Sequence, residues 1–154
     1  MRKLLFIWLV GVLVFLFESC SESRQVKYVF YFIGDGMGVN QVNGTEMYLA
    51  ERDNVIGVKG LNFASFPVRN YATTYSSYHG VTCSAAAGTA LATGEKTKDG
   101  TIGMDKEQKE PLYSVAVRAK EAGRKVGIIT SVGMNHATPA AFYGHQPRRT
   151  MYFE

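Results

Sequence analysis

The sequence VTCSAAAGTALATG, residues 81–94, predicts a helix that begins beside a serine hydroxyl. Alanine and leucine are strong helix formers, and Gly94 is typical of the residue that ends a helix. Ser84 therefore lies at the predicted N-terminus, where unpaired backbone N–H groups favour a bound phosphate or an alkoxide. The alternative is that Ser84 or Thr82 only caps the helix, which is a common role for these residue types.

Three other stretches predict strands. The segments VKYVFYFI (residues 26–33) and VGIITS (residues 126–131) are apolar almost throughout, as in strands buried on both faces of a parallel sheet. A Tyr- and Thr-rich segment, residues 69–75, predicts a third strand. Further helices are expected over residues 41–52 and 112–122. Strand, helix and strand in this order imply a right-handed crossover, so the expected fold class is α/β with a parallel sheet.

Two polar stretches follow the predicted strands. Asp35 lies in the glycine-rich turn GDGMG (residues 34–38), at the sheet edge where catalytic groups of open α/β folds gather. The stretch NHATPAA (residues 135–141) comes after the last strand. His136 and Thr138 are two residues apart, so in an extended segment they would face the same side. Taken singly, all three side chains are equally compatible with ordinary turns and loops.

Taken together, GDGMG, CSAA (residues 83–86), NHATPAA and the following Arg149 resemble the N-terminal half of the alkaline phosphatases. The resemblance runs from about Lys27 to the last residue. It implies a three-layer α/β/α fold with a largely parallel central sheet, incomplete at the C-terminus. It also implies that Ser84 is the nucleophile and that Arg149, eleven residues after Thr138, binds the phosphate through its planar guanidinium.

The same resemblance implies three metal ions, two Zn²⁺ and one Mg²⁺. Asp35 would bridge the zinc pair and the third site, and Thr138 and His136 would serve the third metal. Many relatives have aspartate in place of His136, and a neutral imidazole is softer and carries no negative charge. This difference puts Mg²⁺ preference in doubt and leaves open whether His136 binds directly or through water.

Another difference is Cys83, where many relatives have an aspartate that helps to hold the arginine. A neutral thiol offers no ion pair, so Arg149 is expected to be held more loosely. Sulfatase relatives use Cys-x-Pro-x-Arg, but Ala85 and Ala87 occupy the Pro and Arg positions, which disfavours that branch. A Ser84–His79 pair is also disfavoured, because the sequence places no acidic partner for His79.

The function that the resemblance implies is hydrolysis of phosphate monoesters through a phosphoserine. The family's remaining metal ligands lie in its C-terminal half, so we expect a truncated alkaline phosphatase that is inactive alone and forms a homodimer when complete. One alternative is a non-catalytic, lipid-anchored remnant or binding protein. Another is a related phosphodiesterase or phosphonate hydrolase.

The N-terminus predicts export. Arg2 and Lys3 precede an apolar run, residues 4–17, that is shorter than the roughly 20 residues of a membrane-spanning helix. This pattern is typical of a signal peptide, here over residues 1–19, with a plain signal peptide or an uncleaved anchor as alternatives. Ser19-Cys20 resembles a bacterial lipoprotein processing site, which predicts a lipid on Cys20, a polar tether to residue 26 and anchoring in the periplasm or cell envelope.

Composition sets the remaining bounds. The chain has 154 residues, of which 46% are hydrophobic, so one domain with its own core is expected over residues 27–154. The formal net charge of +4 suits an anionic substrate, and the absence of a basic run argues against nucleic acid. The second cysteine, Cys83, has no partner if Cys20 carries lipid.

Overall fold

The computed structural model describes residues 26–151, and the chain divides into two compact units, residues 1–33 and 34–154. Only residues 26–33 of the first unit are described. The predicted signal peptide and Cys20, with nearly all of its tether, lie outside the described residues. Within residues 26–151, none of the helices combines the length and the apolar character that crossing a membrane requires.

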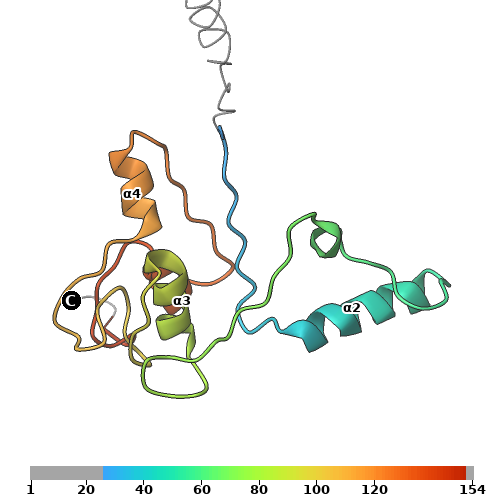
Figure 1. Ribbon diagram of the computed structural model, residues 1–154, viewed down its shortest axis with the longest axis horizontal. Coiled ribbons are helices and arrows are strands. Elements are labelled where there is room, and N and C mark those ends of the chain that lie inside the picture. The colour runs from blue at the N-terminus through green and yellow to red at the C-terminus, as the bar shows by residue number, and fades with distance from the viewer. Residues whose placement is uncertain (1–25, 152–154) are drawn as a thin grey trace, which may run out of the picture. The chain divides into compact units, whose positions relative to one another are not determined.

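The three predicted helices all form (Figure 1). They are α2 (Val39–Arg52), α3 (Ser84–Thr93) and α4 (Val115–Glu121). Gly94 ends α3 as predicted, because its φ of 83° is left-handed and costs a glycine little. Helix α4 begins later than predicted, at the cap residue Ser114, whose Oγ accepts the Val117 N–H at 3.2 Å.

Helix α2 contacts none of the other helices in the described part of the chain. Its first turn is closed by Gln41, whose Oε1 accepts the Gly38 N–H at 3.0 Å. The following loop returns to it, since the backbone N–H of Leu61 donates to Glu46 Oε1 at 2.9 Å. This loop leads into a 3₁₀ turn, η1, over Asn62–Ser65.

The segment around Thr138 differs from the prediction of an extended chain. It forms a short helix, α5 (Ala137–Ala140), with His136 at the N-cap position and Thr138 as its second residue. Pro139 fits because the first turn of a helix leaves its backbone N–H groups unpaired in any case. The extended prediction relied on the restriction that a proline places on the residue before it, and the local helix overrides that preference.

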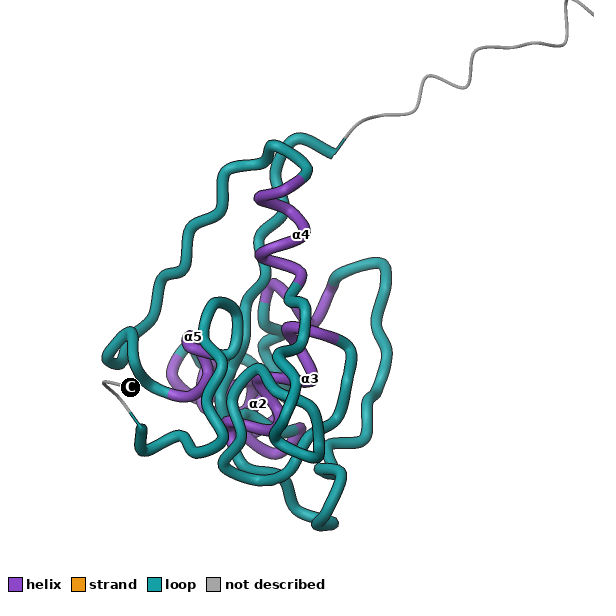
Figure 2. The backbone as a smooth tube through the Cα atoms, turned by 90° about the vertical axis from the view of Figure 1, so that its left-hand side faces the viewer, coloured by secondary structure: helices purple, strands orange, loops and turns teal. Residues whose placement is uncertain are grey.

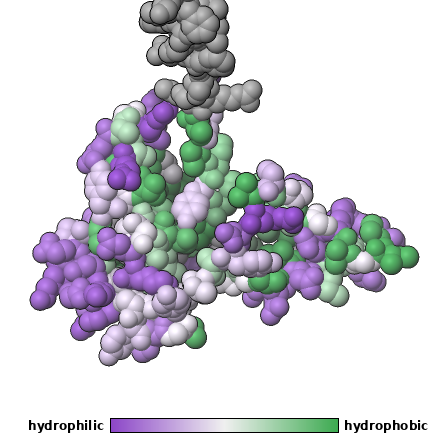
Figure 3. Space-filling view, in the orientation of Figure 1, coloured by the Kyte–Doolittle hydropathy of each residue, from purple (hydrophilic) through white to green (hydrophobic). Residues whose placement is uncertain are grey.

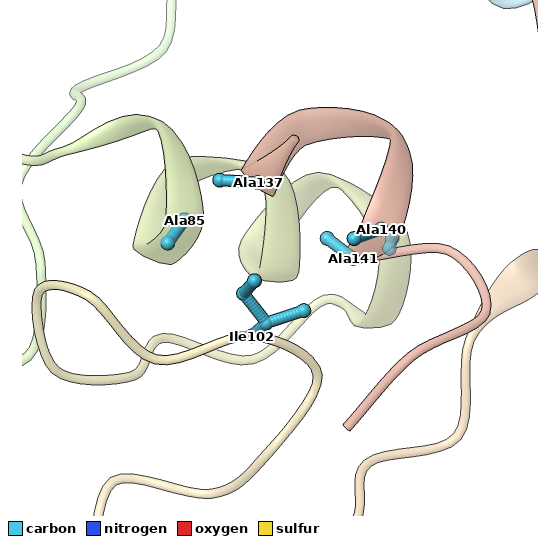
Figure 4. Close-up of a cluster of buried hydrophobic side chains, with 6 residues drawn as sticks. Ala85, Ile102, Ala137, Ala140 and Ala141 are labelled. Carbon is cyan, nitrogen blue, oxygen red and sulfur yellow. The ribbon is translucent and has the colours of Figure 1, made fainter. Parts of the chain in front are cut away.

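The core lies where α3 packs against α5 (Figure 4). Its buried apolar side chains are Ala85, Ala92, Ile102, Ala137, Ala140 and Ala141. Small residues let the two helices approach closely: a Cβ added to Gly88 would lie 3.2 Å from the Ala141 Cβ. Buried threonines complete this centre, and Thr89 Oγ1 accepts the Gly103 N–H at 2.9 Å. The core therefore fixes the position of α5 relative to α3.

The predicted strands do not form. Figure 2 shows helices and loops but no strand in the described residues 26–151, and the only β-bridges found there are isolated. The prediction that residues 26–33 and 126–131 are buried is also wrong, since Phe32 is 88% exposed and Ile129 is 99% exposed. A strand needs a neighbouring segment to pair its backbone N–H and C=O groups, and no described segment pairs with either one. Many apolar side chains therefore remain at the surface (Figure 3).

Replacing Gly103 by alanine should destabilise the fold by roughly 3 kcal/mol. Gly103 has a φ of 58°, and an added Cβ would lie 2.2 Å from the Gly144 carbonyl oxygen. Gly100→Ala is the matched control, because Gly100 has a φ of 84° but open space around its Cβ position. That control should cost only about 1–2 kcal/mol. Urea denaturation of the two variants measures both costs, and equal midpoints would show that the clash with Gly144 contributes nothing.

Candidate metal and phosphate site

Asp35 joins two hydroxyl groups that are far apart in the sequence. Ser84 Oγ donates to Asp35 Oδ1 at 3.1 Å, and Thr138 Oγ1 donates to Asp35 Oδ2 at 2.9 Å. The turn that presents this carboxylate is closed by a backbone bond from the Met37 N–H to the Gly34 carbonyl, 3.1 Å long. The structure thus brings together Asp35, Ser84 and Thr138, as predicted.

The nucleophile candidate lies at the first position of α3. Cys83 occupies the N-cap position in an extended conformation, and no side chain caps the helix. The alternative in which Ser84 or Thr82 serves as the cap is therefore wrong. Thr82 instead donates to the carbonyl oxygen of its neighbour Cys83, at 3.2 Å. The backbone N–H groups of the first turn of α3 are left available for an anionic group beside Ser84.

A loop fixes Cys83 from two directions. The Gly100 N–H donates to Cys83 Sγ at 3.0 Å, and the Cys83 N–H donates to Asp99 Oδ1 at 3.2 Å. The other oxygen of Asp99 lies 4.0 Å from His79 Nε2. His79 therefore does have an acidic partner, which could not be found from the sequence because Asp99 lies far along the chain in an ordinary-looking loop. The Ser84 hydroxyl nevertheless donates to Asp35, so this pair adds no support for a Ser84–His79 catalytic unit.

Arg149 and His136 form a second contact close to the first. Arg149 Nη2 lies 3.5 Å from His136 Nε2, and the backbone N–H of Arg149 donates to the Gly100 carbonyl at 2.6 Å. The Asp35–Thr138 hydrogen bond and the Arg149–His136 contact both involve residues at the start of α5. His136 is its N-cap residue, and Thr138 follows two positions later. The two side chains bond different partners, Arg149 and Asp35, rather than one common group.

The donors available to a metal ion from this chain are mainly oxygens. Within residues 26–151, no three His, Cys, Asp or Glu side chains lie close enough to hold a metal ion. One nitrogen, His136 Nδ1, is buried and has no hydrogen-bond partner among the described residues. The oxygens that meet in the described chain are therefore those of one carboxylate, Asp35, and two hydroxyls, Ser84 and Thr138.

Comparison with known proteins places the chain in a family. The sequence model of the alkaline phosphatase family matches residues 26–154. Mouse tissue-nonspecific alkaline phosphatase is 34% identical over 141 residues, which cover 85% of this chain and 27% of the mouse protein. Alkaline phosphatase 4 of Bacillus subtilis is 35% identical over 134 residues, which cover 84% of this chain and 28% of that protein.

Solved structures of alkaline phosphatases are also similar to this chain. The cold-active alkaline phosphatase of a psychrophilic Shewanella has a TM-score of 0.67 and 35% identity, covering 78% of this chain and 30% of that one. A histidine-to-aspartate mutant of the TAB5 alkaline phosphatase, with Mg bound in its M3 site, has a TM-score of 0.67 and 29% identity over 78% of this chain and 32% of that one. The chain belongs to the alkaline phosphatase family and has a fold of that type. It spans between a quarter and a third of the length of these relatives.

Proposed function

We propose that this chain supplies the nucleophile, the phosphate-binding arginine and some of the metal ligands of an enzyme that hydrolyses phosphate monoesters. The observation that carries the proposal is the pair of hydrogen bonds from Ser84 and Thr138 to the two oxygens of Asp35, at 3.1 and 2.9 Å. These residues are 49 and 103 positions from Asp35, and they meet at the N-terminus of α3. Family membership supports the same reading.

The donor set fits the metals that the family implies. Carboxylate and hydroxyl oxygens suit Zn²⁺ and Mg²⁺, and one carboxylate with two separate oxygens can bridge two ions. Asp35 with Ser84 would hold the zinc pair, and Asp35 with Thr138 would hold the third ion, proposed as Mg²⁺. The Mg bound in the M3 site of the TAB5 mutant, in which a histidine is replaced by aspartate, supports a third site in this family. The metals would supply Lewis acidity at the attacking and leaving oxygens.

The chain's own residues account for the rest of the reaction. Ser84 Oγ forms a bond to phosphorus while the ester bond to the leaving group breaks, and the proton lost from the Ser84 hydroxyl is balanced by the proton that the leaving oxygen takes up, which gives a phosphoserine and an alcohol. The Ser84 hydroxyl donates its proton to Asp35, so the lone pairs of Ser84 Oγ remain available to a metal ion and to phosphorus. Backbone N–H groups of α3 and the Arg149 guanidinium would bind the non-reacting phosphate oxygens. Water then releases phosphate and restores the Ser84 hydroxyl.

A chimera tests this function. Residues 26–154 of this chain would replace the matching segment of Bacillus subtilis alkaline phosphatase 4, which supplies the rest of the fold. With zinc and magnesium added, the chimera should hydrolyse a chromogenic phosphate monoester faster than the corresponding diester or phosphonate ester. Preference for the diester or the phosphonate would favour the related hydrolases. A folded chimera without turnover on any of them would favour the non-catalytic remnant.

The proposed location is the bacterial cell envelope, with a lipid on Cys20 as the anchor. Two or more acyl chains give stable attachment to a membrane, whereas one chain gives only reversible binding. A bacterium that expresses the full chain should incorporate labelled fatty acid into the wild-type protein and not into Cys20→Ala. Cys83→Ala is the matched control and should be labelled like the wild type. Equal labelling of wild type and Cys20→Ala would contradict the anchor. A homodimer of the completed enzyme stays a prediction.

A further inference from the structure

The backbone that carries Arg149 is bonded to the loop that follows α3. The Arg149 N–H donates to the Gly100 carbonyl at 2.6 Å, and Ile102 and Gln146 exchange two backbone hydrogen bonds, each 2.8 Å long. No carboxylate in the described residues forms an ion pair with Arg149. The place of its guanidinium therefore depends strongly on how the backbone of residues 146–149 is held.

Gln108 adds a side-chain contact to the same segment. Its Nε2 donates to the Pro147 carbonyl at 2.7 Å and to Thr101 Oγ1 at 2.8 Å. A carbonyl oxygen only accepts hydrogen bonds, so the NH₂ group of Gln108, and not its amide oxygen, must face Pro147. Proline has no backbone N–H, so its carbonyl is the backbone group through which a hydrogen bond can hold it. Gln108 thus holds the backbone two residues before Arg149.

Thr101 connects the Gln108 amide to α3. Thr101 is fully buried, and its carbonyl accepts the hydroxyl of Thr89, a residue of α3, at 3.3 Å. The amide of Gln108 therefore bonds both to a residue that contacts α3 and to the segment that carries Arg149. Because Ser84 is the first residue of α3, these bonds help to set the place of Arg149 relative to Ser84.

The backbone of Gln108 adopts a conformation that is unfavourable for its residue type. Its φ of 60° is left-handed, where a side chain with a Cβ is strained. Bonds within the loop keep it there: its N–H donates to the Asp105 carbonyl at 3.0 Å, and Asp105 Oδ1 accepts the Lys109 N–H at 2.8 Å. A glycine would relieve the strain but could not supply the amide, which points to a role for the side chain.

We propose that Gln108 is a positioning residue for phosphate binding, whose amide holds the Pro147 carbonyl and thereby places the Arg149 guanidinium relative to Ser84. The role of Arg149 in binding phosphate rests on the proposed function, whereas the placement of its backbone by Gln108 does not. Arg149 would bind the phosphate before and during the reaction alike. Loss of the Gln108 amide should therefore weaken phosphate binding more than it slows the chemical step.

Hydrogen exchange of the full chain, followed by mass spectrometry, tests the placement without any measurement of activity. Gln108→Ala should exchange residues 146–151 about three- to tenfold faster than the wild type, while α3 exchanges at the wild-type rate. Gln108→Glu has nearly the same shape but no donor at neutral pH, so it should behave like Gln108→Ala. Lys109→Ala is the matched control: Lys109 follows in the same loop and is exposed, so this variant should exchange like the wild type.

Gln108→Gly separates positioning from stability. Glycine relieves the left-handed strain, so Gln108→Gly should unfold at a higher temperature than Gln108→Ala. It also lacks the amide, so residues 146–151 should still exchange about as fast as in Gln108→Ala. If the side chain only stabilised its own loop, exchange would follow the unfolding temperature, and Gln108→Gly would lie closer to the wild type. Because Gln108→Gly is free of the strain, it decides the placement even if the other variants do not fold.

Kinetics of the chimera test the effect on phosphate binding. Gln108→Ala and Gln108→Gly should raise KM for the phosphate monoester and the inhibition constant of inorganic phosphate about three- to tenfold, and change kcat less than about twofold. An unchanged KM, or a kcat that falls as far as KM rises, would overturn the proposal. Unchanged exchange of residues 146–151, or exchange that follows the unfolding temperature, would overturn it as well. An inactive chimera with the expected exchange would reject the proposed function alone.

Discussion

Replacing Ser84 by alanine should lower phosphate monoester hydrolysis by the chimera about a thousandfold or more. The substitution removes the oxygen that forms the bond to phosphorus, and it leaves the α3 backbone and Arg149 in place. Loss of a catalytic nucleophile typically costs several orders of magnitude, while the remaining groups still give some rate above that in water. Initial rates with a chromogenic monoester, at saturating zinc and magnesium, measure the effect.

Thr82→Ala is the matched control for this experiment. Thr82 also carries a hydroxyl just before α3, but its hydroxyl donates only to the neighbouring Cys83 carbonyl. Its removal should change the rate by less than about tenfold, because nothing in the proposed reaction depends on it. Acid quenching with labelled phosphate, followed by peptide mapping, should place the label on Ser84. Label on Thr82 or Thr89, or equal rates for Ser84→Ala and Thr82→Ala, would show that Ser84 is not the nucleophile.

The helices could be predicted because their signals are local. The alanine-rich run and Gly94 specify α3 within a short stretch of sequence, and the apolar spacing before Gly123 specifies α4. Strands depend on partners that can be anywhere in a chain. The apolar residues 26–33 and 126–131 carry the composition of buried strands, yet without a paired neighbour among the described residues they remain exposed.

The part of the site that lies in recognisable sequence motifs could be predicted. Three motifs predicted that Asp35, Ser84 and Thr138 meet, and their hydrogen bonds confirm that they do. Other contacts depend on tertiary geometry that no spacing reveals. Examples are the approach of Asp99 to Cys83 and the direction of the His136 ring towards Arg149.

The described residues also bear on what this chain does by itself: residues 21–154, purified alone, should have no phosphatase activity. A zinc ion needs about four ligands, most of them side chains held rigidly in place. Asp35 with Ser84, and Asp35 with Thr138, would supply only two side chains for each proposed site. Metal binding should therefore be weak, and without the metals the Ser84 hydroxyl stays protonated near neutral pH. Exposed Val126 and Ile129 should make the sample poorly soluble as well.

The measurement compares residues 21–154 with the same segment carrying Ser84→Ala, both with excess zinc and magnesium, on a chromogenic phosphate monoester. The two proteins should give equal rates. Both rates should match that of a control with the added metals and no protein. Size-exclusion chromatography of the same samples should show association through the exposed apolar segments. Metal-dependent hydrolysis above the Ser84→Ala level, from a monodisperse sample, would contradict the prediction. It would mean that one carboxylate and two hydroxyls, completed by water, are enough to hold the catalytic metals.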